Sequence, residues 1–318
     1  MTAHDDGVLA GIGNTPLVEL RRVVPRGSAR IFAKLEFANP TGSLKDRMAK
    51  AAVEAAEKDG RLAPGGRVVE YTAGTTGISL AFVCAAKGYG IDIIFSDAFS
   101  DEKRQTMKAF GANVIDVKSD GGKINEALIK EMIRTAAEFS ARPGHWYCDQ
   151  LRNHDASAGY HALGDEIWAQ TGGRVSAFVH AVSTAHSIHG VTEALRKRSS
   201  SIRIVAVEPA ESAVLSGGSS GSHKIEGIGI GFIPPLWQPE LVDEIQTVST
   251  PDAKAMTRRL AREEGIFAGT STGANVVAAL RIAKALGPDA TVVTIAVDSG
   301  LRYLSTDVYR EASPAETS

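Results

Sequence analysis

The chain has 318 residues, of which 43% are hydrophobic and 23% charged, with a formal net charge of -2. This length exceeds what one ordinary core holds, so two packed lobes are expected, and the small net charge excludes broad attraction to nucleic acid or an anionic membrane. The start, MTAHDDGVLA, lacks the basic and apolar regions of a signal peptide, and no apolar run approaches the ~18 residues that cross a bilayer. We therefore expect a cytoplasmic protein without nucleic-acid or membrane partners.

Short β-rich runs alternate with amphipathic stretches along the chain. Strands are predicted at Arg67–Tyr71, Ile91–Ser96, Ala112–Val117, Ser176–Val182, Ile202–Val207 and Thr291–Val297. Helices are predicted at Thr76–Lys87, Asp101–Phe110, Ile124–Phe139, Ala156–Gln170, Ser187–Arg198, Asp252–Glu264 and Gly273–Leu286. Apolar strands that alternate with helices favour parallel sheets buried on both faces. The predicted fold class is α/β, with two doubly wound lobes of mainly parallel sheets, in which ligands collect at the carboxyl ends of strands.

The first segment that contains a candidate catalytic residue is Asn39-Pro40-Thr41-Gly42-Ser43-Leu44-Lys45-Asp46-Arg47. Pro40 and Gly42 mark a turn, Ser43 can cap a helix, and Lys45 falls in the first helical turn. The helix dipole disfavours a cation at this position. That small cost is consistent with a lysine whose charge is consumed in an imine, although most lysines at helix starts are simply solvated.

Three further segments combine small and hydroxyl residues at the start of a helix. Thr72–Gly77 lies between the strand VVEY and the helix ISLAFVCAAK, and Ser183–Ser187 lies between AFVHAV and IHGVTEALRK. Gly269–Ala274 follows one predicted helix and opens another. A strand, a short turn and a helix N-terminus make an anion site from backbone N–H groups and hydroxyls. For Thr72–Gly77, the alternative interpretation is an ordinary strand-to-helix turn without a ligand.

These segments carry a resemblance that extends over nearly the whole chain. It runs from GIGNTPL at Gly11–Leu17 to DSGLRYLST at Asp298–Thr306, with NPTGSLKDR, VEPAESAVLSGG, HKIEGIGIGFIP and REEGIFAGTSTGA between them in order. In these motifs the chain resembles the cysteine synthase (O-acetylserine sulfhydrylase) family, which is related to cystathionine β-synthase. The resemblance implies a fold-type II enzyme, like the tryptophan synthase β subunit, that depends on pyridoxal 5'-phosphate (PLP).

The resemblance also implies roles for the residues at the matching positions. Lys45 would form the Schiff base with the cofactor and move the proton of the substrate Cα. The substrate would be bound by Thr72, Ala73, Gly74, Thr76, Gln150 and Gly227, the last at the start of a segment, Gly227–Gly231, that lines the mouth of the site. The cofactor would be held by Thr75, by the phosphate loop of Ser183, Thr184, Ala185, His186 and Ser187, and by Ser271 at the pyridine nitrogen.

The resemblance further implies a homodimer and a division of the chain into two domains. Residues 48–155 would form a smaller mobile domain that closes on the substrate carboxylate, and residues 1–47 and 156–318 would form the larger PLP-binding domain. Closure would exclude water from the reacting centre. The partners would be a small-molecule amino-acid substrate and a small nucleophile.

The residue at the pyridine nitrogen decides between reaction types. A serine at this position, unlike an aspartate, cannot keep the nitrogen protonated, so the ring withdraws electrons less strongly. Negative charge that develops at the substrate Cα is then relieved more readily by loss of a β-substituent than by delocalisation into the ring. We therefore expect β-replacement, in which an activated serine, such as O-acetyl- or O-phosphoserine, reacts with a sulfur or other small nucleophile. Two alternatives are a β-eliminating lyase that releases an α-keto acid, and a partner-binding relative that has lost turnover.

Two loops depart from the family pattern. The family usually has Ser and Asn where this chain has Ala73 and Thr75. Ala73 removes one hydroxyl, and with the shorter Thr75 the contact that the asparagine makes is lost, shortened or mediated by water. These changes predict a substrate other than, or broader than, O-acetylserine with sulfide; the alternative is a variation without effect on activity. In the phosphate loop, Ser183, Ala185 and His186 replace glycines that permit positive φ. His186 would either point to the phosphate or face outward, and we expect the outward position.

The remaining histidines and the two cysteines predict no metal site. The histidines lack the spacing of metal ligands, and two cysteines are too few for a zinc site. Cys84 and Cys148 lie in apolar or aromatic surroundings, so buried free thiols are expected. We expect His223 to order its loop, and the charge-rich stretch Arg258–Glu264 to be a solvated helix face.

Overall fold

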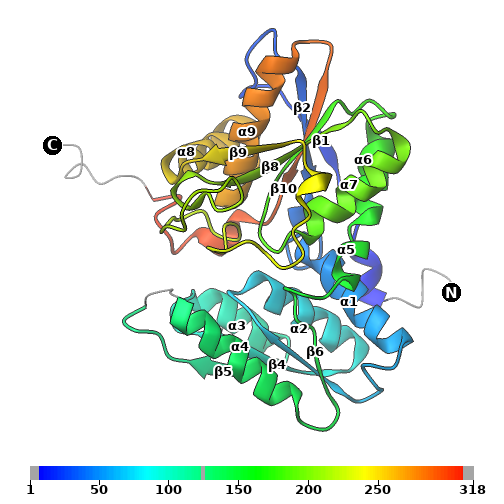
Figure 1. Ribbon diagram of the computed structural model, residues 1–318, viewed down its shortest axis with the longest axis vertical. Coiled ribbons are helices and arrows are strands. Elements are labelled where there is room, and N and C mark those ends of the chain that lie inside the picture. The colour runs from blue at the N-terminus through cyan, green and yellow to red at the C-terminus, as the bar shows by residue number, and fades with distance from the viewer. Residues whose placement is uncertain (1–6, 123–125, 311–318) are drawn as a thin grey trace.

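The computed structural model describes residues 7–122 and 126–310, which fold into two lobes, each built around a sheet (Figure 1). The larger sheet has the strand order β1-β2-β10-β7-β8-β9. Its strands are β1 (Leu17–Leu20), β2 (Arg30–Leu35), β7 (Ala177–Ala181), β8 (Arg203–Pro209), β9 (Glu244–Val248) and β10 (Thr291–Ala296). All neighbours pair in parallel except β1 and β2. β7, β8 and β10 are the strands whose apolar residues are buried on both faces, as expected for a central parallel sheet.

The smaller sheet has the order β5-β4-β3-β6 and is parallel throughout. It consists of β3 (Arg67–Tyr71), β4 (Gly90–Ser96), β5 (Asn113–Val117) and β6 (His145–Tyr147). The two sheets confirm the predicted fold class of two doubly wound lobes with mainly parallel strands.

The helices divide between the two sheets, as Figure 1 shows. With the smaller sheet lie α2 (Thr75–Lys87), α3 (Asp101–Ala109) and α4 (Glu126–Ser140). With the larger sheet lie α6 (His161–Gln170), α7 (His186–Arg198), α8 (Thr250–Arg259) and α9 (Thr270–Leu286). At the junction of the lobes lie α1 (Lys45–Lys58) and α5 (Asp155–Ala158). None of the helices within residues 7–122 and 126–310 is long and apolar enough to cross a membrane.

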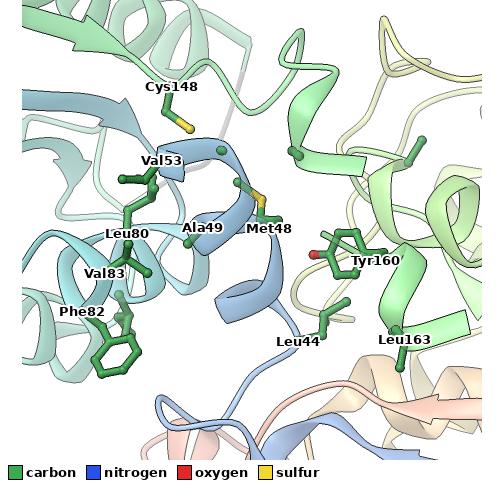
Figure 2. Packing of buried hydrophobic residues seen from close by; sticks show 14 of the residues in the cluster. Leu44, Met48, Ala49, Val53, Leu80, Phe82, Val83, Cys148, Tyr160 and Leu163 are labelled. Carbon is green, nitrogen blue, oxygen red and sulfur yellow. The ribbon is translucent and has the colours of Figure 1, made fainter. Parts of the chain in front are cut away.

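Helix α1 packs against both lobes. Figure 2 shows its buried side chains between α2 and Cys148 on one side and Tyr160 and Leu163 on the other. Met48, Ala49 and Val53 are each completely buried in this cluster. Burying an aliphatic side chain of this size contributes roughly 1.5–3 kcal/mol, so the helix that begins with Lys45 is held firmly in place.

A buried charge network anchors the start of α1 to the larger lobe. Arg47 donates from Nε to Glu36 Oε2 at 2.7 Å and from Nη1 to Glu166 Oε1 at 2.8 Å. Lys34 Nζ lies 2.6 Å from the other oxygen of Glu166. Burial opposes ionisation of Glu166, but the hydrogen bonds from Arg47 and Lys34 outweigh it and lower its pKa to about 2. Each charge is therefore paired, which is the condition for burying it without a large penalty.

Several predicted boundaries are wrong. The helix predicted at Ala156–Gln170 is two helices, α5 and α6, separated at Gly159. At this glycine the chain passes so close to Arg47 that an added Cβ would overlap the Arg47 carbonyl oxygen. The sequence prediction missed β1, β2, β6 and β9. The predicted start of Ile124–Phe139 and the polar tail after Arg310 lie outside the described residues.

The stretch Arg258–Glu264 is more than a solvated helix face, which corrects the prediction. It ends α8 and continues as a π-helix, Leu260–Glu264. Oε1 of Glu264 accepts hydrogen bonds from the backbone N–H groups of Arg21, Arg22 and Val23, at 3.0, 2.5 and 2.8 Å. The carboxylate thus fixes the loop between β1 and β2.

Candidate active site

The candidate loops converge where strands of the two sheets end. In the larger lobe, Leu44 N donates to Val297 O at 3.0 Å, and Val297 N donates to Thr272 Oγ1 at 2.9 Å. Val297 follows β10, which pairs in parallel with β7, the strand that leads to Ser183. Lys45, the start of α9 and the phosphate loop therefore share the carboxyl edge of one sheet. The loop Thr72–Gly77 follows β3 in the smaller lobe and opens α2.

Lys45 is the first residue of α1 and is half-buried. Its backbone N–H donates to Ser43 Oγ at 3.2 Å, but the N-cap residue is Leu44 and has no side-chain cap, so Ser43 stabilises the turn before the helix and does not cap it as predicted. Burial lowers the pKa of the Lys45 amine to about 8, against a smaller opposing effect of Glu70. Within the described part of the chain, its Nζ has no hydrogen-bond or ion-pair partner. An amine of this kind is available for chemistry near neutral pH.

The loop Thr72–Gly77 presents free backbone donors at the start of α2. Gly74 has φ +137°, and its N–H donates to Thr72 Oγ1 at 2.9 Å. The N–H groups of Ala73, Thr75, Thr76 and Gly77 donate to no other residue among those described. Aligned N–H groups at a helix N-terminus form a binding site for a carboxylate.

Gln150 is held beside this loop, as predicted. Its Oε1 accepts from Thr76 Oγ1 at 2.8 Å, and its Nε2 donates to Tyr71 O at 3.1 Å. Its backbone N–H donates to Glu70 Oε2 at 3.1 Å. These bonds fix the amide and use only one of its two side-chain N–H groups, so the other remains for a ligand.

The phosphate loop has a left-handed turn without glycine. Ala185 has φ +72°, a region that costs a non-glycine residue about 1 kcal/mol or more. None of the backbone N–H groups from Ser183 to Ile188 donates to a residue in the described ranges. The loop therefore keeps the anion-binding shape that glycine normally provides, at a cost in backbone strain.

The expected outward position of His186 is wrong. Its side chain is completely buried, with Nδ1 3.0 Å from Thr184 Oγ1 and Nε2 2.9 Å from Asn153 O. The ring points into the protein interior, toward Asn153 in the segment that leads to α5. Burial, together with the charge of Lys45, lowers its pKa to about 3, so the imidazole is neutral.

Ser271 and the Gly227–Gly231 segment complete the larger lobe's side. Ser271 is buried in the first turn of α9, and no described residue shares a hydrogen bond with its hydroxyl. Glu226 N donates to Thr270 Oγ1 at 3.1 Å, and Gly229 N donates to Val182 O at 3.1 Å. The segment thus runs between the start of α9 and the phosphate loop. His223 orders it as predicted, since Nε2 bonds to Gly229 O at 2.8 Å.

An ion pair connects the two lobes beside the site. Lys103 on α3 of the smaller lobe lies 2.6 Å from Glu226 Oε2 of the larger lobe. The aliphatic part of Lys103 packs over Gly74, where an added Cβ would overlap its Cδ. The pair therefore covers the Thr72–Gly77 loop and links it to the Gly227–Gly231 segment.

Sequence reasoning missed four polar residues that support the site. Asp46 accepts from Thr41 N at 2.8 Å and from Ser79 Oγ at 2.6 Å, which joins the turn before Lys45 to α2. His180 and Asn275 lie behind the phosphate loop, and Lys103 lies over the carboxylate loop. The signal for His180 was present: a histidine inside the apolar strand AFVHAV, three residues before Ser183. Asn275 similarly follows the Gly269–Ala274 motif directly.

Both cysteines are buried and free, as predicted. His189, another buried histidine, stacks on Trp237 with ring centroids 5.6 Å apart, so it has a packing role. These three residues lie outside the loops described above.

Comparison with known proteins agrees with this geometry. Residues 8–298 match the family model described as pyridoxal-phosphate dependent enzyme. A cysteine synthase of Staphylococcus aureus is 43% identical over 96% of this chain and 97% of its own. The crystal structure of cysteine synthase from Entamoeba histolytica superposes with a TM-score of 0.90 at 40% identity, covering 96% of this chain and 91% of the other. That of O-ureido-L-serine synthase gives a TM-score of 0.88 at 34% identity and covers 98% of both chains.

These similarities cover almost the entire chain and both lobes. They confirm the predicted resemblance, the PLP cofactor and the class of PLP-dependent β-replacement enzyme. The chain belongs to the family of pyridoxal-phosphate dependent enzymes.

Proposed function

We propose that this protein is a β-replacement enzyme of the cysteine-synthase type, which joins an activated serine to a sulfur or other small nucleophile. The observation that carries the proposal is the unpartnered amine of Lys45, at the strand edge that it shares with the phosphate loop and α9. The residues fit PLP: an amine for its aldehyde, free N–H groups from Ser183 to Ile188 for its phosphate and the Ser271 hydroxyl for its ring nitrogen. When bound, PLP supplies a ring that stabilises negative charge at the substrate Cα.

In this proposal each loop has one task. The free N–H groups of the Thr72–Gly77 loop and the remaining N–H of Gln150 bind the substrate α-carboxylate and so orient Cα toward Lys45. Lys45 holds the cofactor and then, as a neutral amine, takes the Cα proton. Ser271 offers the ring nitrogen a hydroxyl rather than a carboxylate, which favours loss of the β-substituent over transamination. The nucleophile then adds at the β-carbon, and the protonated Lys45 amine returns a proton to Cα.

The test of this proposal is an assay of products. The purified enzyme is supplied with O-acetylserine or O-phosphoserine, with and without sulfide, and the amino acid and keto acid are measured. We expect cysteine to exceed pyruvate when sulfide is present. Pyruvate and ammonia as main products even at saturating sulfide would favour the lyase instead. A protein that neither gains visible cofactor absorbance with PLP nor turns over would favour the partner-binding relative.

The substitution Thr75→Asn tests whether the altered carboxylate loop sets substrate preference. Thr75 is half-buried at the first position of α2, and its single hydroxyl replaces the longer amide of the family. A directed hydrogen bond to a substrate group is worth about 1.5 kcal/mol, or about tenfold. We therefore expect the ratio of kcat/KM values for O-acetylserine and O-phosphoserine to change by about tenfold.

Ala73→Ser is the matched neighbour for this test, since it restores the other family hydroxyl at an exposed loop position. Its effect on the ratio should be smaller than that of Thr75→Asn. An unchanged donor preference in Thr75→Asn would show that the loop variation has no bearing on specificity.

We further propose that residues 48–155 form a mobile domain and that the enzyme acts as a cytoplasmic homodimer. The separate four-stranded sheet supports the domain, and the Lys103–Glu226 pair would have to break when it opens. The free cysteines suit a reducing compartment, and a second copy would cover the exposed Leu301 and Leu304. Cell fractionation tests the location, and sedimentation tests the dimer, which a mass of 33.5 kDa in solution would exclude.

A further inference from the structure

Asn275 and His180, both buried behind the phosphate loop, form a chain of hydrogen bonds with Ser187 of the loop. The orientation of Asn275 sets the direction of this chain. Oδ1 of Asn275 accepts from the Ala181 N–H at 2.7 Å, and its Nδ2 donates to Ile295 O at 2.8 Å. A backbone N–H can only donate and a carbonyl can only accept, so the amide cannot be reversed. Its Nδ2 also lies 3.4 Å from Nδ1 of His180. Asn275 therefore presents a hydrogen to His180.

Asn275 determines which ring nitrogen of His180 carries the hydrogen, and His180 in turn bonds to the loop. His180 is buried at the end of β7, where burial, together with the charge of Lys45, lowers its pKa to about 3. The neutral ring carries one N–H, and because Nδ1 faces a donor, that hydrogen is on Nε2. Nε2 lies 2.8 Å from Ser187 Oγ, so His180 donates and Ser187 accepts. The hydrogen of the Ser187 hydroxyl is left free, and no described residue accepts it.

The other hydroxyl of the loop, that of Thr184, donates to a histidine, whereas that of Ser187 accepts from one. Nε2 of His186 lies 2.9 Å from the carbonyl oxygen of Asn153, which can only accept, so Nε2 carries the hydrogen. In the neutral ring Nδ1 is then an acceptor. Thr184 Oγ1, 3.0 Å away, must donate to it. The Thr184 hydroxyl thus donates its hydrogen to His186 and can only accept hydrogen bonds from other groups.

We propose that Ser187 is the side-chain hydroxyl that donates to the cofactor phosphate, that Thr184 does not donate to it, and that His180 and Asn275 are positioning residues that set this direction. The inference rests on the proposed function, in which this loop holds the phosphate. A phosphate bears negative charge and needs donors, so the two hydroxyls are unequal although they flank the same turn. The backbone N–H groups from Ser183 to Ile188 supply the other donors.

The test compares Ser187→Ala with Thr184→Val in the full-length holoenzyme. The dissociation constant for PLP is obtained from the loss of visible cofactor absorbance at increasing dilution. A hydrogen bond to a charged group is worth enough to raise this constant about tenfold or more in Ser187→Ala. Thr184→Val should change it by less than about threefold. Equal weakening in both variants, or a larger effect of Thr184→Val, overturns the proposal.

The role of His180 is tested through Ser187. His180→Leu should raise the dissociation constant as Ser187→Ala does, and it should add nothing in the double variant. His180→Gln, which can still donate to Ser187, should restore binding. The phosphorus resonance of the bound cofactor should shift in Ser187→Ala and His180→Leu but not in Thr184→Val. Additive effects of His180→Leu and Ser187→Ala would show that His180 does not act through the hydroxyl.

Two controls separate the possible failures. Thermal melting identifies a variant that does not fold, and the comparison of Ser187→Ala with Thr184→Val then still decides. The wild-type protein is also reconstituted with pyridoxal, which lacks the phosphate. Equal binding of pyridoxal and PLP would overturn the phosphate site and with it the proposed role of the loop. A strong preference for PLP with equal effects of the two hydroxyl variants would overturn only the inferred direction.

Discussion

Replacing Lys45 with alanine is expected to lower turnover with O-acetylserine and sulfide by about 10³-fold or more. Proton transfer by a positioned group contributes about 10²–10⁴-fold, and the variant also loses the covalent attachment of the cofactor. The fold should be unaffected, because the Lys45 amine has no partner in the described structure while the rest of α1 is packed on both sides. The measurement is cysteine formation at saturating PLP, with the melting temperature recorded alongside.

Lys58→Ala is the matched control, since it removes an exposed lysine at the other end of the same helix. It should retain nearly full activity. If Lys45→Ala kept more than a tenth of wild-type turnover, Lys45 would be neither the base nor the anchor of the cofactor.

The depressed pKa of Lys45 predicts a pH dependence for cofactor uptake. Burial lowers this pKa from 10.5 to about 8, and the neutral amine is the form that reacts. The neutral fraction rises about tenfold per pH unit below 8 and levels off above it. The rate of PLP uptake by the cofactor-free protein should follow this curve. A rate that still rose steeply between pH 9 and 10 would mean that the amine keeps its ordinary pKa.

Replacing Arg47 with methionine is expected to cost about 3–5 kcal/mol of stability, because it leaves the buried carboxylate of Glu36 without its guanidinium partner and that of Glu166 with Lys34 alone. The side chain of Glu36 is completely buried and that of Glu166 is 14% exposed, so water cannot replace the guanidinium. Urea denaturation of wild type and variant at pH 7, followed by tryptophan fluorescence, measures the loss.

The stability that Arg47→Met loses should be smaller at acidic pH. The pKa of Glu166 is lowered from 4.5 to about 2 in the folded protein, so its pairing stabilises above pH 4.5 and is lost as the pH falls toward 2. Arg61→Met is the control, because its pairs with Asp59 and Asp155 are exposed and screened by solvent, and therefore contribute little to stability. Similar losses in both variants would contradict the argument from burial.

Sequence patterns predicted the bounds of some elements closely. The strand Arg67–Tyr71 has the predicted bounds, and the helix at Asp101 differs by one residue at its end. β2 was missed because Arg30 and Lys34 interrupt its pattern, although Lys34 is in fact buried against Glu166. β6 has only three residues, and β9 is an edge strand with half-buried polar residues. In each case contacts from distant residues, rather than local preference, stabilise the strand.

In the candidate site, the sequence identified the loops but not the direction of their side chains. The order of motifs placed Lys45, the two candidate anion-binding loops and Ser271 at the starts of helices, where the structure has them. It could not show that His186 turns inward, because that depends on the carbonyl of Asn153 and the space below the loop. It also gave no reason to connect His180 with Asn275, which are 95 residues apart.

The inward turn of His186 has a mechanical consequence. Asn153, whose carbonyl accepts from His186, lies just before α5, where the chain passes from the smaller lobe to the larger one. The loop assigned to the phosphate and the crossing segment are therefore coupled through one buried hydrogen bond. Any rotation of the smaller lobe about this crossing would either break that bond or carry the imidazole with it, and would therefore also displace the loop assigned to the phosphate.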